Sequence, residues 1–168
     1  DFCDDKANEV NVPTGLVREF MEREQAHLNA LTSGRGTEDA SALKIRMQEI
    51  MTERVGIFRT GAALQSAVDD LQKLLVRSRN IGLRNHAPGA NPELVTAYRV
   101  QKMLKLALCV AYGALQRTES RGAHAREDYP RRDDANWLKR TLATWNAEND
   151  TLPTLNYEAL SVGKMELP

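Results

Sequence analysis

The sequence predicts a mainly α-helical protein, a three- to four-helix antiparallel bundle followed by a small C-terminal β element. Apolar residues recur at helical spacing between residues 61 and 80, the pattern of a helix with one buried face. An Asn-Pro pair at 91–92 begins a second long apolar stretch, and this pair is a typical helix start. Beyond residue 136 the spacing changes to the alternation of a strand. Short connections make successive helices antiparallel neighbours.

The first helix is expected from about Thr14 to Leu31. Pro13 disfavours a helical conformation at the residue before it, and Thr14 can act as the N-cap. One side of this helix is mostly apolar and predicts an amphipathic element, with Leu16, Phe20, Met21, Glu24 and Leu28 along it. We place His27 on its polar face. A loop with two glycines follows at 32–38.

The second helix is expected to start after Asp39 or Ser41 and to end near Val55, where Gly56 supplies a C-terminal signal. Its predicted buried stripe consists of Leu43, Met47, Ile50, Met51 and Ile57. Thr60 then caps a third helix from about 61 to 80. This helix has the most regular apolar pattern of the chain, formed by Leu64, Ala67, Val68, Leu71, Leu74 and Leu75.

The fourth helix is expected from Asn91 to about Arg117, after a loop at 81–90 that contains His86. Its second half, from Leu106 to Leu115, is apolar on most faces, which predicts a central position in the bundle. After residue 136, alternating residues from Trp137 to Trp145 and again from 155 to 160 predict two strands. The long connection between them is compatible with a loose hairpin or with strands that pair elsewhere.

The stretch between the last helix and the first of these strands, residues 117–137, is unusually rich in charge, and we call it the signature loop. From Arg117 to Asp134 it contains five Arg, five Asp or Glu and no Lys. Arginine is preferred where planar, bidentate pairing with carboxylates is needed. The composition therefore predicts an ion-pair network in an irregular segment that turns at Gly122. An anion-binding site is the alternative, which the local balance of charge disfavours.

Within the signature loop we expect three arginines to pair with acids of the same chain. These are Arg121, Arg126 and Arg132, and the expected partners are Glu119, Asp128, Asp133 and Asp134. His124 is expected against the same cluster. Ser120, His124 and Asp128 follow one another at intervals of four, but stacking on one helix face does not give the geometry of a catalytic triad.

Composition excludes several functions. The 23 basic and 23 acidic residues balance, so nucleic-acid binding is not expected. The three histidines are too scattered for a metal site, and the sequence shows no GxGxxG or P-loop. Cys3 and Cys109 form no CxxC motif, and Cys109 is expected as a buried, reduced thiol of a cytosolic protein. The longest apolar run is too short to span a bilayer.

A long motif covers the signature loop and carries a family resemblance. Its matching positions are Glu119 to Gly122, Ala123 and His124, Arg126 to Asp128, Pro130, Arg132 to Asp134, and Trp137 to Lys139. This motif resembles a signature near the C-terminus of the flavoprotein subunit of fumarate reductase and succinate dehydrogenase. The run MQEIMTERVGIFRT at 47–60 and the final LNYEAL and MELP segments look similar to that family as well.

The resemblance implies a non-catalytic C-terminal helical domain of a fumarate reductase flavoprotein subunit, and the first residue, Asp1, agrees with a part of a longer polypeptide. Residues 1–40 would connect it to the flavin-binding domain and include a helix. Residues 41–135 would form the helical bundle with the signature loop, and 136–168 the β element. The alternatives are the C-terminal domain of an L-aspartate oxidase, which shares part of the motif, or a free-standing helical interaction module.

The parent enzyme would interconvert fumarate and succinate with FAD, and its partners would be the flavin-binding domain and an iron–sulfur subunit. It would lie in the cytoplasm, peripheral on the inner face of the cytoplasmic membrane, without direct membrane insertion. The isolated chain is expected to be inactive, with no catalytic, cofactor-binding or metal-binding residue. The following residues are assigned a structural or interface role: Glu119, Ser120, Arg121, Gly122, His124, Arg126, Asp128, Arg132, Asp133, Asp134 and Trp137.

Overall fold

The structure, a computed structural model, describes residues 14–86 and 89–160. The long helices of this part are α2 (Thr14–Ser33), α3 (Ala40–Arg54), α4 (Gly61–Arg77) and α5 (Pro92–Gln116). The shorter elements are the 3₁₀ helix η1 (Ser78–Asn80), α6 (Asp134–Trp137), β1 (Phe58–Arg59), β2 (Ala125–Arg126), β3 (Lys139–Thr144) and β4 (Thr154–Ala159). The prediction of a mainly helical protein with a small C-terminal β element is confirmed.

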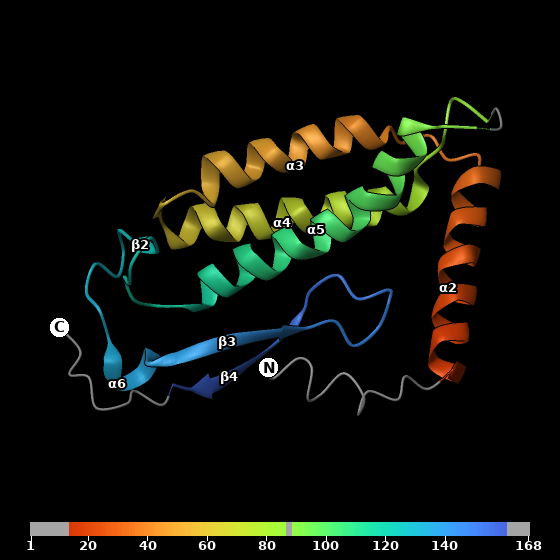
Figure 1. Cartoon of the computed structure of the whole chain (residues 1–168). Helices are drawn as coiled ribbons and strands as arrows, with labels where there is room; N and C mark the ends of the chain where they lie inside the picture. Colours follow the sequence, from red (N-terminus) through yellow and green to blue (C-terminus); the bar gives the residue numbers. More distant parts are fainter. Residues whose placement is uncertain (1–13, 87–88, 161–168) are drawn as a thin grey trace.

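Helices α3, α4 and α5 lie side by side in alternating directions and enclose the core (Figure 1). Their starts are fixed as predicted, because the side chains of Asp39, Thr60 and Asn91 accept hydrogen bonds from first-turn amides. The whole apolar stripe predicted for α4 is buried. The pattern between residues 61 and 80 therefore identified the central surface of the bundle correctly.

Helix α2 stands across one end of this three-helix layer instead of joining it as a fourth antiparallel member (Figure 1). Only Leu31, near its C-terminal end, is buried, whereas Leu16, Phe20 and Met21 are exposed. Helix α2 therefore has the predicted apolar face, but most of this face is exposed in the described part of the chain. The predicted polar position of His27 is wrong, because its ring packs edge-on against Tyr98 of α5, with ring centroids 5.5 Å apart.

Two predicted boundaries are wrong, because a residue that lies outside a helix or strand was assigned to it. Ile57 lies beyond the end of α3 and is exposed, so it does not extend the stripe of Leu43, Met47 and Ile50. Trp137 belongs to α6, because the Asp133 side chain caps a short helical turn there, and β3 starts only at Lys139. Period-two spacing cannot distinguish a strand from the turn that leads into it.

Strands β3 and β4 form an antiparallel hairpin in which Lys139 pairs with Ala159 and Thr144 with Thr154. Of the two predicted alternatives, the hairpin is therefore correct, and the strands do not pair elsewhere in the described residues. The hairpin runs along α5 (Figure 1). The indole nitrogen of Trp145 donates to the sulfur of Cys109 at 3.3 Å, which places this thiol against the hairpin, partly buried and unpaired. Cys3 lies outside the described residues. No helix of the described part is long and apolar enough to cross a membrane.

Helix α5 is central on the sides that face α3 and α4, but it keeps one uncovered side. Leu104 and Leu108 are fully buried, together with Leu71 and Leu75 of α4, whereas Leu106 is 66% exposed. The expectation that the second half of α5 is covered on most faces is therefore correct only for part of its surface.

This difference within one helix gives a matched stability test. We expect Leu108→Ala to lower the free energy of unfolding by about 2–5 kcal/mol, because it leaves a cavity in the core. Leu106→Ala removes the same atoms from an exposed site and should change it by less than about 0.5 kcal/mol. Chemical denaturation of both variants measures the difference. Equal losses would mean that the core is not centred on this side of α5.

The signature loop as the candidate functional site

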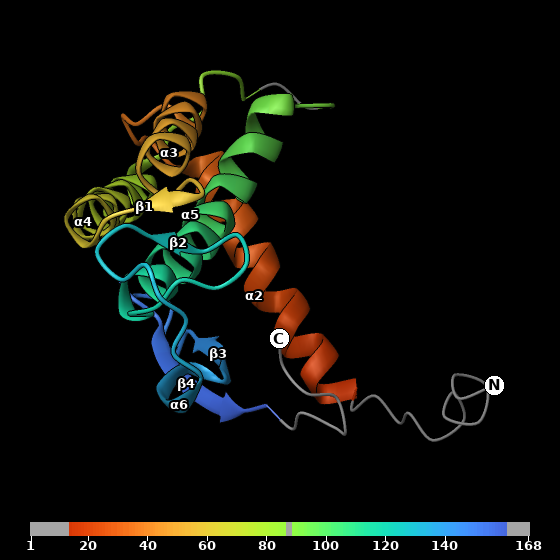
Figure 2. The same ribbon diagram turned by 90° about the vertical axis from the view of Figure 1, so that its left-hand side faces the viewer.

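The signature loop lies across the end of the bundle where α5 ends and α4 begins. Figure 2 looks onto this end, where β2 runs beside β1 in front of the helix ends. The two short strands are parallel, with Phe58 opposite Ala125 and Arg59 opposite Arg126. Gly122 has a φ of +57°, the left-handed conformation that favours glycine at a tight turn, as predicted for this position.

Arg126 closes the C-terminal end of α5 and is almost completely buried, with 3% exposure. One of its terminal nitrogens, Nη1, donates to the carbonyl oxygens of Ala114 and Leu115 at 3.0 Å and of Arg117 at 3.1 Å. These carbonyls would otherwise lack partners at the helix end. A cation at this position also complements the negative end of the helix dipole.

Asp128 joins Arg126 to the start of α4. Its two carboxylate oxygens accept from Nε and Nη2 of Arg126 at 2.7 and 2.8 Å, and one of them accepts from the Gly61 amide at 3.0 Å. The Arg126 guanidinium and the Gly61 amide hold the pKa of Asp128 down, to about 2. A Cβ at Gly61 would lie 2.9 Å from this carboxylate and 3.2 Å from Nη2 of Arg126, so a larger residue there would displace the ion pair.

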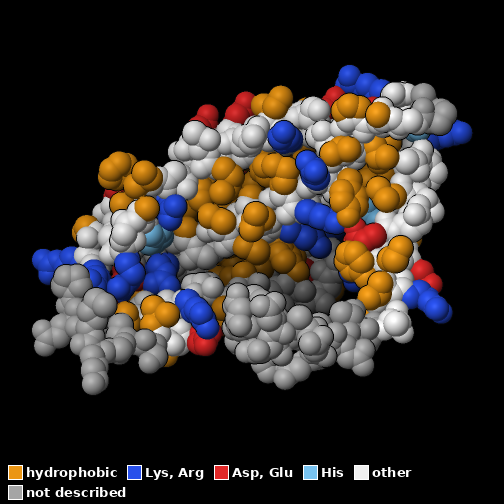
Figure 3. Space-filling view, viewed as in Figure 1, with side chains coloured by type: hydrophobic (Ala, Val, Ile, Leu, Met, Phe, Trp, Pro, Cys, Tyr) orange, Lys and Arg blue, Asp and Glu red, His pale blue; other side chains and the backbone are white. Residues whose placement is uncertain are grey.

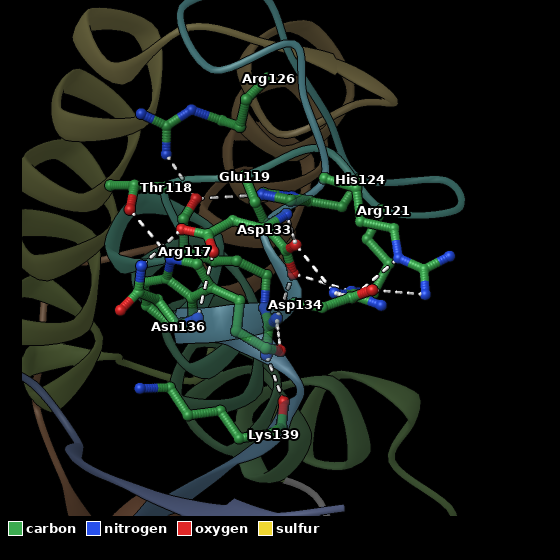
Figure 4. A network of polar contacts seen from close by, with 12 residues as sticks. Arg117, Thr118, Glu119, Arg121, His124, Arg126, Asp133, Asp134, Asn136 and Lys139 are labelled. Carbon is green, nitrogen blue, oxygen red and sulfur yellow. Dashed lines mark hydrogen bonds and ion pairs between the residues drawn. The ribbon is translucent and has the colours of Figure 1, made fainter. Parts of the chain in front are cut away.

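Glu119 is the second centre of the loop and is completely buried (Figure 4). It accepts from Arg117 Nη1 at 2.6 Å, from Arg121 Nε and Nη2 at 2.8 and 3.0 Å, and from the Asp133 amide at 2.9 Å. Burial alone would raise the pKa of this carboxyl group, but the donors from Arg121, Asp133 and Arg117 lower it overall. Glu119 is therefore a buried carboxylate matched by two arginines.

Arg117 connects Glu119 to the start of the C-terminal hairpin. Its guanidinium donates to the carbonyl oxygens of Trp137 at 3.0 Å and Lys139 at 2.7 Å, and it lies 4.9 Å from the centre of the Trp137 ring. Trp137 in turn packs edge-on against Tyr157 of β4. The first residue after α5 thus positions the start of β3.

His124 lies among three cations, with Arg59 as its nearest partner. Its Nδ1 faces Nη1 of Arg59, and its Nε2 lies 3.2 Å from the Arg117 carbonyl oxygen. A neutral ring that donates through Nε2 and accepts through Nδ1 satisfies both contacts. Burial, followed by the charges of Arg59, Arg126 and Arg117, lowers the pKa of His124 although the Arg117 carbonyl raises it. Charging this imidazole is therefore unfavourable in the folded protein.

Arg59 binds backbone carbonyl oxygens at the C-terminal end of α3, as Arg126 does at the C-terminal end of α5. Its guanidinium donates to the carbonyl oxygens of Gly56 and Val55 at the end of α3, at 2.5 and 3.3 Å. Burial and the charge of Arg126 lower its pKa. Two arginines thus close the C-terminal ends of two neighbouring helices, and His124 lies between them.

The prediction that Arg121, Arg126 and Arg132 pair with acids of this chain is confirmed. The structure pairs Arg121 with Glu119, Arg126 with Asp128 and Arg132 with Asp134. Asp134 also pairs with Arg121. The expected arginine pairing of Asp133 is wrong, because its side chain caps α6 by accepting from the Asn136 amide at 3.1 Å. A helix of one turn is too short to show periodicity, so the capping role of Asp133 could not be predicted from the sequence.

Sequence reasoning missed the residues that come from outside the loop. Arg59 and Gly61 lie far from it in sequence. The run at 47–60, which showed only a family likeness, contains Arg59 and ends one residue before Gly61. Ser120 is engaged with backbone, since its hydroxyl accepts from the Arg126 amide at 2.8 Å and donates to the Tyr129 carbonyl at 2.9 Å. No group of three or more His, Cys, Asp or Glu side chains in the described residues could hold a metal ion.

Comparisons with known proteins agree with this arrangement. The family model of the fumarate reductase flavoprotein C-terminal region matches residues 44–168. A fumarate reductase flavoprotein subunit of Helicobacter pylori is 48% identical over 159 residues, 95% of this chain and 22% of the relative. A succinate dehydrogenase flavoprotein subunit of Coxiella burnetii is 35% identical over 117 residues, 70% of this chain and 20% of the relative.

Among solved structures, the FrdA chain of E. coli quinol fumarate reductase superposes with a TM-score of 0.86 at 28% identity, covering 95% of this chain and 27% of that chain. The fold of this chain is thus found as part of a longer chain in a solved quinol fumarate reductase. This chain belongs to the family of C-terminal domains of fumarate reductase and succinate dehydrogenase flavoprotein subunits. The alternatives of an L-aspartate oxidase domain and a free-standing interaction module are not favoured.

The helix-closing role of Arg126 can be measured directly. We expect Arg126→Ala to lower the free energy of unfolding by about 2–5 kcal/mol, because the carbonyl oxygens of Ala114 and Leu115 at the end of α5 lose their buried donor. Arg140→Ala breaks the exposed pair of Arg140 with Glu158 on the hairpin and should cost less than about 1 kcal/mol. Chemical denaturation compares the two variants. A loss for Arg126→Ala no larger than that of the control would show that Arg126 does not support the helix ends.

The low pKa of His124 predicts a pH dependence with a definite sign. Because the folded state resists protonation, the unfolded state binds protons first as the pH falls below the ordinary histidine pKa of 6.5. The free energy of unfolding should therefore decrease between about pH 7 and pH 5. His124→Gln should reduce this slope, whereas His86→Gln, at an exposed loop position, should retain it. Denaturation across this pH range tests the assignment, which an unchanged slope in His124→Gln would contradict.

Proposed function

We propose that this domain is the non-catalytic C-terminal part of a fumarate reductase flavoprotein subunit whose parent interconverts fumarate and succinate with FAD. The parent would exchange electrons through an iron–sulfur subunit and lie peripherally on the cytoplasmic side of the membrane. The 48% identity to the Helicobacter subunit supports fumarate reductase over succinate dehydrogenase. The chain spans only 22% of that relative, so the remainder of such a subunit would contain the flavin site.

One observation carries the non-catalytic role. Of the five arginines of the signature loop, four bind protein acceptors and are therefore not available to a dicarboxylate substrate, namely Arg117, Arg121, Arg126 and Arg132. Arg117 and Arg121 share the buried Glu119, and Arg126 binds Asp128 and three backbone carbonyls. These arginines stabilise the helix ends and the position of the hairpin. We therefore assign a structural role to the signature residues between Glu119 and Trp137. Residues 1–40 would connect the domain to the flavin-binding domain, 41–135 would form the bundle with the signature loop, and 136–168 would form the β element.

The first test uses the chain alone. The purified 168-residue chain is expected to carry no flavin and to reduce no fumarate with an artificial electron donor. The full-length subunit, purified together with its iron–sulfur subunit, should do both. Absorbance spectroscopy and a fumarate reduction assay measure these properties. Stoichiometric flavin on the isolated chain would contradict the proposal, and so would a full-length complex without fumarate reductase activity.

The second test separates structural from substrate-binding arginines. In the full-length complex, Arg121→Ala is expected to lower the thermal midpoint because buried Glu119 loses one of its two arginine partners. The KM for fumarate should stay within about twofold of the wild-type value, since uniform substrate binding is unaffected. Thermal unfolding and steady-state kinetics on the same preparation give both quantities. A KM raised by tenfold or more with an unchanged midpoint would place Arg121 at the substrate instead.

A further inference from the structure

A basic groove lies between α2, α5 and the loop that joins β3 to β4. Two adjoining cavities form it, of about 540 and 330 Å³, and both are lined by His27, Gln101, Lys105 and Glu148. Figure 3 shows Lys and Arg side chains gathered in the middle of this face, between apolar patches. We call this feature the α2 groove.

The larger cavity of the α2 groove carries uncompensated positive charge. Three cations line it, Arg35, Arg79 and Lys105, against the single carboxylate of Glu148. None of these four side chains forms an ion pair within the described residues. Arg79 and Lys105 donate instead to the backbone carbonyl oxygens of Asn149 and Glu148, at 2.9 and 3.3 Å. A neutral carbonyl is a weaker partner for a cation than an ionised oxygen, so the charge of both remains available to an anion.

Arg35 is fixed beside this cavity by its backbone. It pairs with Gly82 in an isolated β-bridge, next to backbone hydrogen bonds that join Glu38 to Asn80 and Gly82 at 3.0 and 3.1 Å. A Cβ at Gly82 would lie 1.8 Å from the carbonyl oxygen of Gly36, so this close approach requires glycine. The Arg35 side chain itself has neither a hydrogen bond nor an ion pair within the described part of the chain. A guanidinium without a partner on a fixed backbone is pre-organised for a ligand.

The floor of the larger cavity is apolar, and one nitrogen of its wall lacks a partner. Leu31, Leu75 and Ile81 line the cavity and are buried. The Nε2 atom of His27 is buried without a hydrogen-bond partner among the described residues. Buried polar atoms without a partner are rare in folded proteins, and an anionic oxygen would supply an acceptor for a protonated Nε2. A compact ligand with several anionic oxygens therefore fits this lining.

We propose that the α2 groove is a binding site for a small multivalent oxyanion, that is, a di- or tricarboxylate or a diphosphate. Arg35 and Arg79 each offer a planar guanidinium to one oxyanion group, and Lys105 adds a third positive charge. An anion with two or three charges compensates this lining, whereas a monovalent anion leaves most of its charge unmatched.

The size and walls of the cavity favour a small molecule. Its volume of about 540 Å³ lies within the range of about 300–1,000 Å³ that is usual for small-molecule sites. Helices α2, η1 and α5 and the hairpin loop all contribute to its lining, which leaves less room for a polypeptide than for a compact ligand. This proposal does not depend on the enzymatic function of the parent.

Amide NMR of the ¹⁵N-labelled 168-residue chain tests the site directly. Citrate and, in a separate sample, pyrophosphate are titrated, and at least one of them should shift the signals of Arg35, Arg79 and Lys105 with a Kd below about 1 mM. Binding of citrate alone would identify a carboxylate ligand, and binding of pyrophosphate alone a diphosphate. The signals of Arg121 and His124, in the signature loop, should not move.

Sodium chloride at the same ionic strength is the control, because added salt also screens charges without binding at a site. Groove shifts no larger with citrate and pyrophosphate than with chloride would overturn the proposal. Shifts centred on the signature loop would overturn it as well, since they would place the anion at the opposite end of the bundle.

A matched pair of arginine variants assigns the binding to the groove. Arg35→Ala removes a guanidinium that has no partner in the described residues, so the dispersed amide spectrum should be retained. The Kd should rise about tenfold, as expected for the loss of a charge-assisted hydrogen bond. Arg35→Lys keeps the charge without the planar fork and should give an intermediate Kd.

Arg99→Ala is the control for the loss of one positive charge. Arg99 is an exposed arginine of α5 that lines neither cavity of the groove, so its replacement should leave the Kd within about twofold of the wild-type value. Equal Kd values for Arg35→Ala and Arg99→Ala would mean that the anion responds only to net charge, which contradicts a built site.

The full-length subunit, purified with its iron–sulfur subunit, extends the test to the parent. The tighter-binding probe, at about ten times its Kd, should raise the thermal midpoint of the wild-type complex and of Arg99→Ala, but not that of Arg35→Ala. An equal rise in all three would place the ligand outside the groove, and no rise in any would mean that the groove is closed to ligands in the parent. Either result would overturn the proposal, and neither depends on whether the complex reduces fumarate.

Discussion

The Arg126–Asp128 ion pair fixes the relative positions of the two central helices. Arg126 binds the last carbonyls of α5, and Asp128 binds the first amide of α4, so each charge meets the helix end of opposite sign. Since Arg126 is buried, its charge must be matched by acceptors inside the protein. The glycine at position 61, the turn at Gly122 and the parallel β1–β2 contact all serve to bring these groups together.

A second buried charge extends the same principle to the rest of the domain. Glu119 draws Arg117 and Arg121 together, and Arg117 reaches on to the carbonyls before β3. Arginine suits this position because one planar guanidinium can bind a carboxylate and a carbonyl at once. Lysine could not replace it without losing donors. The absence of lysine from the first eighteen residues of the signature loop thus has a geometric cause.

The two ends of the bundle differ in how far their charges are satisfied. At the signature loop, Glu119 is paired with Arg117 and Arg121, and Arg126 is paired with Asp128, which supports the structural role that we propose for this end. At the other end, α2 leaves the bundle with an apolar stripe exposed, beside cations that have no carboxylate partner among the described residues.

The sequence by itself determined the four long helices, three of their N-caps and the fact that arginines of the signature loop pair with acids of the same loop. These features depend on local spacing, as in the stripe from Leu64 to Leu75 and the pair of Arg126 with Asp128. Tertiary structure alone decided that Arg59 closes α3 beside His124, that Asp128 reaches Gly61, and that α2 stands across the bundle. The reason is that an amphipathic pattern shows which face of a helix seeks cover, while the partner that covers it depends on contacts between residues far apart in sequence.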